Sequence, residues 1–329
     1  MRRTKMKKVC QVVGLVVVVA LVVVGLKFFG TEKVVVDTSE QMQKIKEYAN
    51  PDNFVTPFQL NEMLKSKKQH VVVIGSLKPA KMAAPIAGSF TMWRSDYSAA
   101  KDAYPFGGMR NTTEEMEKIL SSFGVTPEST IVVYAAGKHH DAARLWWQIK
   151  QLGHKDVRFL DGGLNAWEGA GYATGNANPT VKATNYKASN PAAWTLADLD
   201  MVKNAIASDE WIIIDTRSTK ENDGSSVKKG AFGPGSIPTS VFINWENCNN
   251  EDSTMKSLAE LKALYSDLVK GKKVITFCQS GVRSAHTAMV LKEILGAQDV
   301  YNYDGSWIEW SYTHYKQDEK VAIINGEKK

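Results

Sequence analysis

Cys278 stands where an apolar, β-type run ends, and it is the residue of this chain best placed to act as a nucleophile. The run 274–277 precedes it, a short loop with one glycine follows, and a helical pattern begins at Arg283. Loop N–H groups and a helix N-terminus can converge on such a sulfur, favour negative charge there and lower the pKa of the thiol. The pattern predicts a nucleophilic thiolate in an anion-binding cradle, with Arg283 as a fixed cation at its rim.

The spacing from Cys278 to Arg283 separates two chemistries. Four residues lie between them, giving C-x4-R. Cysteine phosphatases use C-x5-R, so the loop here is one residue shorter and suits one sulfur atom or a small oxyanion better than a phosphoryl group. Taken alone, the loop leaves open a second interpretation, in which Cys278 is a buried strand-end cysteine and Arg283 is a surface residue.

Composition narrows the function classes. The 329 residues are 43% hydrophobic and 23% charged, as in a folded globular protein, and much of the net charge of +6 lies in the first eight residues. Without a basic patch interleaved with aromatics, no nucleic-acid partner is indicated. The three cysteines, Cys10, Cys248 and Cys278, cannot form a disulfide framework and lack zinc-ligand spacing. We therefore expect neither a metal nor a cofactor, and Cys248 to be a free loop cysteine, with a role in resolving an oxidised Cys278 as the alternative.

The N-terminus carries a targeting or anchoring pattern. A basic cluster precedes an uninterrupted apolar run over residues 12–26, followed by Lys27, Phe28 and Phe29. If Lys27 snorkels, the run is long enough for a short spanning helix. Because no Ala-x-Ala-like triplet follows, we predict an uncleaved transmembrane signal-anchor over residues 1–30, with a cleaved signal peptide and a secreted or periplasmic protein as the alternative. In both cases the positive-inside bias places the bulk of the protein on the extracytoplasmic side.

The rest of the chain reads as two copies of one unit. A shift of 143 positions lays the run 131–134 on 274–277 and Asp161-Gly162 on Asp304-Gly305. Within each copy, β-rich runs alternate with helical patterns, which predicts α/β domains with mainly parallel sheets flanked by helices. We expect a linker over 31–54, a first domain over 55–173, an interdomain linker over 174–193, a second domain over 194–316 and a tail over 317–329.

In the second copy, the predicted elements can be placed individually. The strands are Trp211–Asp215, Val241–Ile243, Val274–Phe277 and Val300–Tyr303, and the helices are Leu196–Ala207, Leu258–Leu268 and Arg283–Leu295. Ligands bind where strands of such sheets end.

The two copies differ where the chemistry would be. Cys278 falls on Ala135, Arg283 falls on His140, and the segment 215–217 falls on 74–76. The first copy is therefore predicted to be catalytically inactive. Its Lys138-His139-His140 segment is expected to be exposed loop, with an anion or metal site as the alternative.

From about residue 55 to 315 the chain resembles the two-domain rhodaneses, sulfurtransferases acting on thiosulfate or 3-mercaptopyruvate. The resemblance is carried by 213–217, 235–238, the Cys278 loop, 303–307, 143–147 and 161–167. Two features depart from the family. The usual Gly-His-Ile-Pro-Gly-Ala turn lacks its histidine in both copies, and the loop over 278–283 matches neither subfamily, since Ser280-Gly281 leans to mercaptopyruvate enzymes and Arg283 to thiosulfate enzymes.

The resemblance implies a mechanism and roles for named residues. The Cys278 thiolate takes sulfur from a small anionic donor and passes it, through a persulfide, to a thiol or cyanide. The loop residues Gln279, Ser280, Gly281 and Val282 stabilise that sulfur, while Arg217 and Arg283 hold the donor.

Three residues around the predicted site each have two possible roles. Asp215 orients Arg217 or the loop, or caps a turn; His286 faces the loop or packs its helix; Trp307 walls the pocket or packs in the core. A membrane-tethered persulfide carrier without small-molecule turnover, or a cysteine phosphatase or arsenate reductase, stay as alternative functions.

Overall fold

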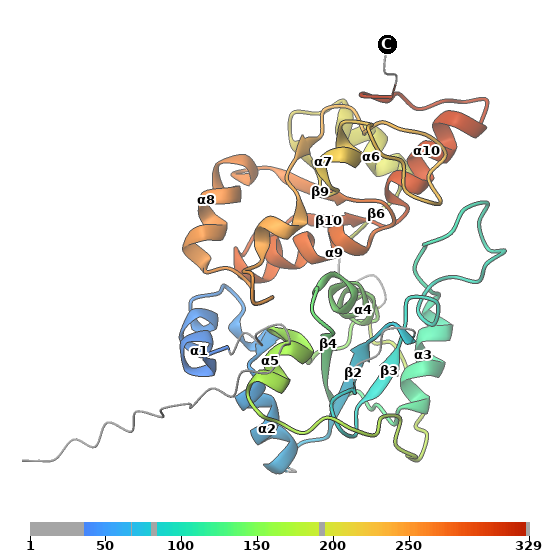
Figure 1. Ribbon diagram of the computed structural model, residues 1–329. Coiled ribbons are helices and arrows are strands. Elements are labelled where there is room, and N and C mark those ends of the chain that lie inside the picture. The colour runs from blue at the N-terminus through green and yellow to red at the C-terminus, as the bar shows by residue number, and fades with distance from the viewer. Residues whose placement is uncertain (1–35, 67, 80–83, 191–194, 327–329) are drawn as a thin grey trace, which may run out of the picture. The chain divides into compact units, whose positions relative to one another are not determined.

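The first domain is built on a five-stranded parallel sheet. The computed structural model describes residues 36–66, 68–79, 84–190 and 195–326 (Figure 1). The strands run in the order β1-β5-β4-β2-β3, and their pairings are parallel. They are β1 (Phe54–Val55), β2 (Val71–Ser76), β3 (Phe90–Met92), β4 (Thr130–Ala135) and β5 (Val157–Leu160). The central strand β4 is buried along its whole length, as expected for a parallel strand covered on both faces.

The helices of this half begin at polar capping residues where the chain supplies them. The Thr112 hydroxyl accepts a hydrogen bond from the Glu115 N–H and so starts α3, and Asp37 does the same for α1 through the Ser39 N–H. The helices are α1 (Thr38–Lys46), the 3-10 turn η1 (Pro51–Asn53), α2 (Pro57–Ser66), α3 (Thr113–Ser122), α4 (His140–Gln151) and α5 (Gly163–Gly169).

The second domain repeats the sheet with the same strand order. Its parallel strands run β6-β10-β9-β7-β8. They are β6 (Leu196–Ala197), β7 (Trp211–Asp215), β8 (Val241–Phe242), β9 (Lys273–Phe277) and β10 (Val300–Tyr303). The predicted tandem α/β architecture with parallel sheets is thereby confirmed.

The helices of the second half include three that the sequence patterns did not single out: α7, η3 and α10. The full set is α6 (Leu199–Ile206), α7 (Thr219–Asn222), η3 (Trp245–Cys248), α8 (Leu258–Val269), α9 (Val282–Met289), the π-helical turn η4 (Val290–Ile294) and α10 (Ser306–Lys316). The predicted helix over 196–207 begins later than expected, because Leu196 and Ala197 pair with β10 as strand β6.

The two sheets share one hydrophobic core through α4 and α9. These helices pack against each other (Figure 1), and all eight residues of α9 are buried. A single cluster of buried residues includes Leu145 and Trp146 of α4 together with Ala285 and Met289 of α9. The helix that follows the Cys278 loop is therefore covered on one side by α4 of the other copy.

Segments expected to be linkers make specific contacts instead. In the segment 31–54, the Gln41 side chain donates to the Asp161 carbonyl at 2.9 Å, and the Tyr48 hydroxyl donates to the Lys256 carbonyl, also at 2.9 Å. In the segment 174–193, Tyr186 is 2% exposed. In the tail, Ile324 forms a bridge with Ser236. Each of these segments covers part of a domain rather than only joining domains.

The predicted signal-anchor over residues 1–30 lies outside the described residues. None of the helices in the described part of the chain combines the length and apolar character that crossing a bilayer requires.

Candidate active site

The turn between β9 and α9 depends on a glycine. Gly281 has φ +69°, in the left-handed region, and a Cβ built on it would lie 2.8 Å from the Asp304 carbonyl oxygen. A side chain at this position would meet both backbone strain and a clash with backbone. The close approach lets the loop 278–281 curl tightly around the Cys278 sulfur.

Cys278 is almost fully buried, at 1% exposure, and yet the pKa of its thiol is lowered. Burial alone would raise the pKa of this thiol, but the Arg283 cation and hydrogen bonds from the Ser284 and Ser280 N–H groups and the Ser284 hydroxyl outweigh it and lower the pKa. The Ser284 hydroxyl lies 3.6 Å from the sulfur. The prediction of an N–H-lined thiolate cradle thus matches the observed geometry in this respect.

Ser306 holds the two ends of the loop together. Its hydroxyl oxygen accepts hydrogen bonds from the Cys278 N–H at 3.1 Å and the Gly281 N–H at 2.9 Å, and the hydroxyl donates to the Tyr303 carbonyl at 2.7 Å. Ser306 does this from a positive φ of 51°, unusual for a residue other than glycine. Ser306 belongs to the predicted 303–307 motif, but no role was expected for it from sequence.

Ser284 and Asn302 form a second support behind the sulfur. The Ser284 hydroxyl lies 2.6 Å from the Asn302 side-chain oxygen, and the Asn302 amide donates to the Gly281 carbonyl at 3.1 Å. Since a hydroxyl has one proton, Ser284 donates either to Asn302 or to the sulfur at a given moment. Neither residue was singled out from sequence.

Arg283 is held between the sulfur and a carboxylate. Its two terminal nitrogens each donate to Glu221 at 2.7 Å, and its guanidinium also reaches Cys278. Although burial opposes it, this pairing lowers the pKa of Glu221 to about 2, with help from Ser218 and Lys228. The only sequence signal for Glu221 is the Ser-x-x-Glu capping box that starts α7.

Arg217, predicted to hold the donor, is bonded to neighbouring groups of its own domain. Its guanidinium is 1% exposed, is bonded to Asp215 through contacts of 2.6–3.1 Å, and donates to the Gly235 carbonyl at 2.9 Å. It stacks on Trp307 at 4.8 Å, and the Trp307 ring N–H donates to the Gly233 carbonyl. Asp215 therefore orients Arg217, one of its predicted roles, and Trp307 packs against that pair. The geometry gives Arg217 a structural position rather than a place on the donor.

The remaining predicted residues divide between loop and core. Gln279 is 9% exposed and its carbonyl accepts from the Ile308 N–H at 3.0 Å, while Val282 is buried at the start of α9. His286 is fully buried, 5.2 Å from the Trp245 ring and 6.3 Å from the His139 ring. Of its two predicted positions, His286 occupies the packing one.

The loop of the first copy is filled in rather than open. Alignment of the two copies by sequence placed Asp215 on residue 74, but in the structure Asp215 corresponds to Gly75. Gly75 lies opposite Tyr134 in the first sheet as Asp215 lies opposite Phe277 in the second. A Cβ on Gly75 would lie 2.6 Å from the Tyr134 ring, so the tyrosine occupies the space at this strand end. The Tyr134 hydroxyl bonds to Ser89 at 2.8 Å, much as Asp215 bonds to Ser236 at 2.9 Å in the second copy.

The expectation of an exposed Lys138-His139-His140 loop is wrong for the histidines. His139 is 1% exposed, and the His140 side chain is 16% exposed and packs on Trp245 at 4.6 Å. Both face the packed core around α9, where burial lowers the pKa of each. Within the described ranges, no group of three or more histidine, cysteine or acidic side chains is placed to hold a metal ion.

Cys248 is a core residue and not a loop thiol. It is fully buried, its sulfur lies 3.2 Å from the Tyr265 hydroxyl, and burial raises the pKa of its thiol to about 12. A thiol in this state is a poor nucleophile.

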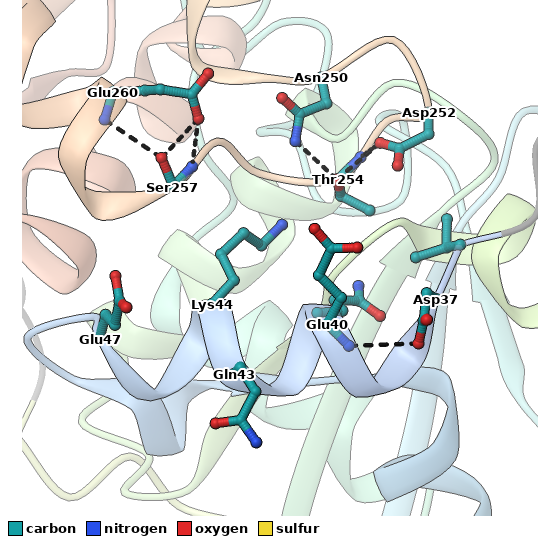
Figure 2. Close-up of a pocket in the computed structure, with 12 residues that line it drawn as sticks. Asp37, Glu40, Gln43, Lys44, Glu47, Asn250, Asp252, Thr254, Ser257 and Glu260 are labelled. Carbon is teal, nitrogen blue, oxygen red and sulfur yellow. Dashed lines mark hydrogen bonds between the residues drawn. The ribbon is translucent and has the colours of Figure 1, made fainter. Parts of the chain in front are cut away.

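A separate pocket of about 390 Å³ lies between α1 and the segment 250–260. Figure 2 shows Lys44 reaching from α1 across this space, with Glu40, Glu47 and Glu260 around it. Its lining includes no residue of the loop 278–283. This pocket is therefore separate from the Cys278 site.

Comparison with known proteins agrees with this geometry. Residues 34–170 and 198–313 match the rhodanese-like domain. A "putative thiosulfate sulfurtransferase" of Saccharopolyspora erythraea is 38% identical over 205 residues, 60% of this chain and 72% of the relative. The sulfur carrier protein TtuD of Thermus thermophilus is 30% identical over 277 residues, 80% of this chain and 95% of that protein.

Solved structures share the fold at low identity. The ergothioneine-bound form of EanB superposes with a TM-score of 0.75 at 22% identity, covering 85% of this chain and 71% of that one. YnjE superposes with a TM-score of 0.72, also at 22% identity, covering 85% of this chain and 70% of that one. With both of its halves matched, the chain belongs to the rhodanese-like family, as a tandem of two such domains.

Proposed function

We propose that the protein is a sulfurtransferase that works through a persulfide on Cys278. The Cys278 thiolate attacks the outer sulfur of thiosulfate, the sulfur–sulfur bond of the donor breaks, and sulfite leaves with the bonding electrons. An acceptor thiolate or cyanide then attacks the outer sulfur of the persulfide and regenerates the Cys278 thiolate. The observation that carries the proposal is the buried Cys278 sulfur, surrounded by N–H and hydroxyl donors and by Arg283, which together lower its pKa.

A cation beside the sulfur suits a small anionic donor. Arg283 and Lys228 both lie against Glu221, at 2.7 Å and 3.3 Å, so these three side chains carry a net positive charge of one, which offsets the charge of the Cys278 thiolate when an anionic donor approaches. Thiosulfate and 3-mercaptopyruvate are both anionic. Relatives from Saccharopolyspora erythraea and Mycobacterium leprae are named for thiosulfate. We propose thiosulfate as the preferred donor and 3-mercaptopyruvate as a secondary one.

The proposal is tested by following the sulfur atom. After incubation with thiosulfate, peptide mass spectrometry is expected to show one added sulfur on Cys278 and none on Cys248, and cyanide is expected to remove it with formation of thiocyanate. Parallel assays with thiosulfate and 3-mercaptopyruvate rank the donors by kcat/KM. A protein that turns over a donor with unmodified Cys278 throughout would refute the persulfide mechanism.

A sulfur-carrier role is a second candidate, and one observation favours it. Cys278 is 1% exposed, so a persulfide there would be shielded from bulk thiols, as suits a sulfur held for a protein acceptor. A relative matched over 95% of its length is a sulfur carrier protein. A carrier is expected to load one sulfur on Cys278 but to release it to cyanide or small thiols only slowly, whereas an enzyme releases it in repeated turnovers.

We also propose that residues 1–30 anchor the protein in a membrane, with both domains on the extracytoplasmic side. The support is the basic cluster before the apolar run over 12–26. In cells producing the full chain, the protein is expected to resist extraction from membranes at high pH and to be digested by protease added outside the cytoplasmic membrane. A mature N-terminus beyond residue 26 would refute the anchor and leave export intact.

A further inference from the structure

Arg144 belongs to the domain without a cysteine, yet its side chain reaches the catalytic loop of the other domain. It lies on α4 and is 2% exposed. One terminal nitrogen donates to the Gly281 carbonyl at 3.3 Å, and the other donates to the Gly108 carbonyl at 3.2 Å and forms an ion pair with Asp304. One guanidinium thus joins a loop of its own domain to the catalytic loop.

The Gly281 carbonyl is an effective place to control the cradle. The same oxygen accepts from the Asn302 amide at 3.1 Å, and the N–H of Gly281 donates to the Ser306 hydroxyl at 2.9 Å. The peptide groups on both sides of Gly281 are therefore fixed. Because the Ser280 and Ser284 N–H groups that stabilise the thiolate flank this residue, their direction depends on it.

The Gly108 end of the contact covers the loop. Gly108 has φ +97°, and a Cβ on it would lie 2.8 Å from the Ser280 Cβ, so backbone of the first domain lies directly against the cradle. The Arg110 N–H donates to Asp304 at 3.0 Å, which ties the same stretch down at a second point. Arg144 and Asp304 together hold the cover and the cradle in one arrangement.

The duplication supplies a matched contact without a cysteine. Asp161 occupies the position of Asp304 in the first copy, and its carboxylate accepts from the Met255 N–H at 2.7 Å, just as Asp304 accepts from Arg110. The cation beside Asp161 is Lys44, at 3.2 Å, which also donates to the Met255 carbonyl. Figure 2 shows Lys44 extending from α1 toward the segment of the second domain that contains Thr254.

We propose that Arg144 is a positioning residue for Cys278, acting across the domain boundary by fixing the Gly281 peptide. The domain that lost its own chemistry then supplies a necessary part of the active loop. For sulfur transfer this inference rests on the proposed function, but its effect on the thiol does not.

The test compares three variants of the full chain. Arg144→Met removes the guanidinium. Arg144→Lys keeps a charge for Asp304 but cannot reach Gly281, Gly108 and Asp304 together. Lys44→Met breaks the corresponding contact at Asp161. The readout is the rate of Cys278 alkylation by iodoacetamide as a function of pH, resolved from the other cysteines by peptide mass spectrometry. Unfolding temperature and kcat/KM for thiosulfate are measured on the same samples.

Arg144→Met is expected to raise the midpoint of the alkylation profile by about one pH unit, which is roughly a tenfold loss of thiolate below the midpoint. Arg144→Lys is expected to keep most of the unfolding temperature and still raise the midpoint. Lys44→Met is expected to lower the unfolding temperature and to keep the midpoint of the alkylation profile at its wild-type value.

An unchanged midpoint in both Arg144 variants would overturn the inference, and if Arg144→Met does not fold, Arg144→Lys decides alone. Wild-type protein with a low alkylation midpoint but no sulfur transfer would refute the proposed function and leave this inference standing.

Discussion

Substitutions of Arg283 and Arg217 should affect two different properties of the second domain. Arg283 contacts both the Cys278 sulfur and Glu221, whereas Arg217 is enclosed with Asp215 and Trp307. Arg283 is therefore expected to control the charge state of the thiol. Arg217 is expected to control the stability of the fold.

The size of the Arg283 effect follows from the contact it makes. A hydrogen bond between charged groups is worth about 1.5–3 kcal/mol, and one pKa unit corresponds to about 1.4 kcal/mol. Losing Arg283 should thus raise the pKa of Cys278 by about one to two units. Because Glu221 is 2% exposed and would keep only Lys228 at 3.3 Å and the Ser218 donors around its charge, the informative variant is Arg283→Met combined with Glu221→Gln, with Glu221→Gln alone as its control.

The Arg217 effect has a different origin. Asp215 is fully buried, and without the Arg217 guanidinium its charge is left to neutral donors, which are the backbone N–H of residue 217 at 3.0 Å, the Ser236 hydroxyl at 2.9 Å and the Asn222 amide at 3.0 Å. Removing one partner of a buried ion pair costs about 3–5 kcal/mol. Arg217→Met should therefore lower the unfolding temperature sharply, and adding Asp215→Asn should restore part of it, since the uncompensated charge is gone.

The assays are the pH profile of Cys278 alkylation, the unfolding temperature, and kcat/KM for thiosulfate. If the Arg283→Met, Glu221→Gln protein alkylates with the wild-type midpoint, the electrostatic reasoning is wrong. If Arg217→Met keeps its unfolding temperature and instead loses only its affinity for anionic donors, the original prediction that Arg217 holds the donor was right and the structural reading is wrong.

Three further outcomes are expected. Cys278→Ser abolishes persulfide formation, while Cys248→Ser keeps most of the transfer rate, because only the first sulfur lies in a donor-lined cradle; an active Cys278→Ser protein would contradict this. Ser306→Ala leaves the Cys278 and Gly281 N–H groups without their acceptor and should cut the rate of persulfide formation about tenfold, at about 1–3 kcal/mol for the lost contact; an unchanged rate would show that the loop does not need it. Burial lowers the pKa of His139, His140 and His286, so the unfolded state binds protons more readily than the folded state. The unfolding temperature should therefore fall as the pH drops below about 6.5 and be flat above it, and His286→Met should weaken the fall. An equal fall at acid pH in the wild type and in His286→Met would argue against this.

The strands of the second domain could be predicted closely from the sequence because they are rich in β-branched and aromatic residues and most of their positions in β7, β9 and β10 are buried. Trp211–Asp215 and Val300–Tyr303 were placed at their observed bounds, and Val274–Phe277 lacks only Lys273. Burial on both faces of a parallel sheet produces continuous apolar runs of this kind. The two-residue strand β6 has no such run, since its place is decided by pairing with β10.

The catalytic cysteine candidate was visible in the sequence, but most of its support was not. Strand, loop and helix are consecutive there, so local pattern places Cys278 at the turn. Ser306 reaches the loop from 28 positions further on, and Arg144 from another domain. Arg217 shows the reverse case, because an arginine two residues after an aspartate at a strand end can face a pocket or fold back on that aspartate. Only the surrounding Trp307 and Gly235 decide between these orientations.

The duplication also explains how the first domain, which has Ala135 where the second has Cys278, contributes to the structure of the whole chain. Both copies use the aspartate after their last strand to grip backbone of the other copy, Asp161 at Met255 and Asp304 at Arg110. These contacts and the packing of α4 on α9 do not depend on a cysteine, so they are compatible with Ala135 at the position that corresponds to Cys278. With all eight residues of α9 buried, the helix that starts at the Cys278 loop requires a partner on its outer face. Exclusion of water from that face strengthens the electrostatic interactions around the sulfur, and α4 of the first domain excludes it.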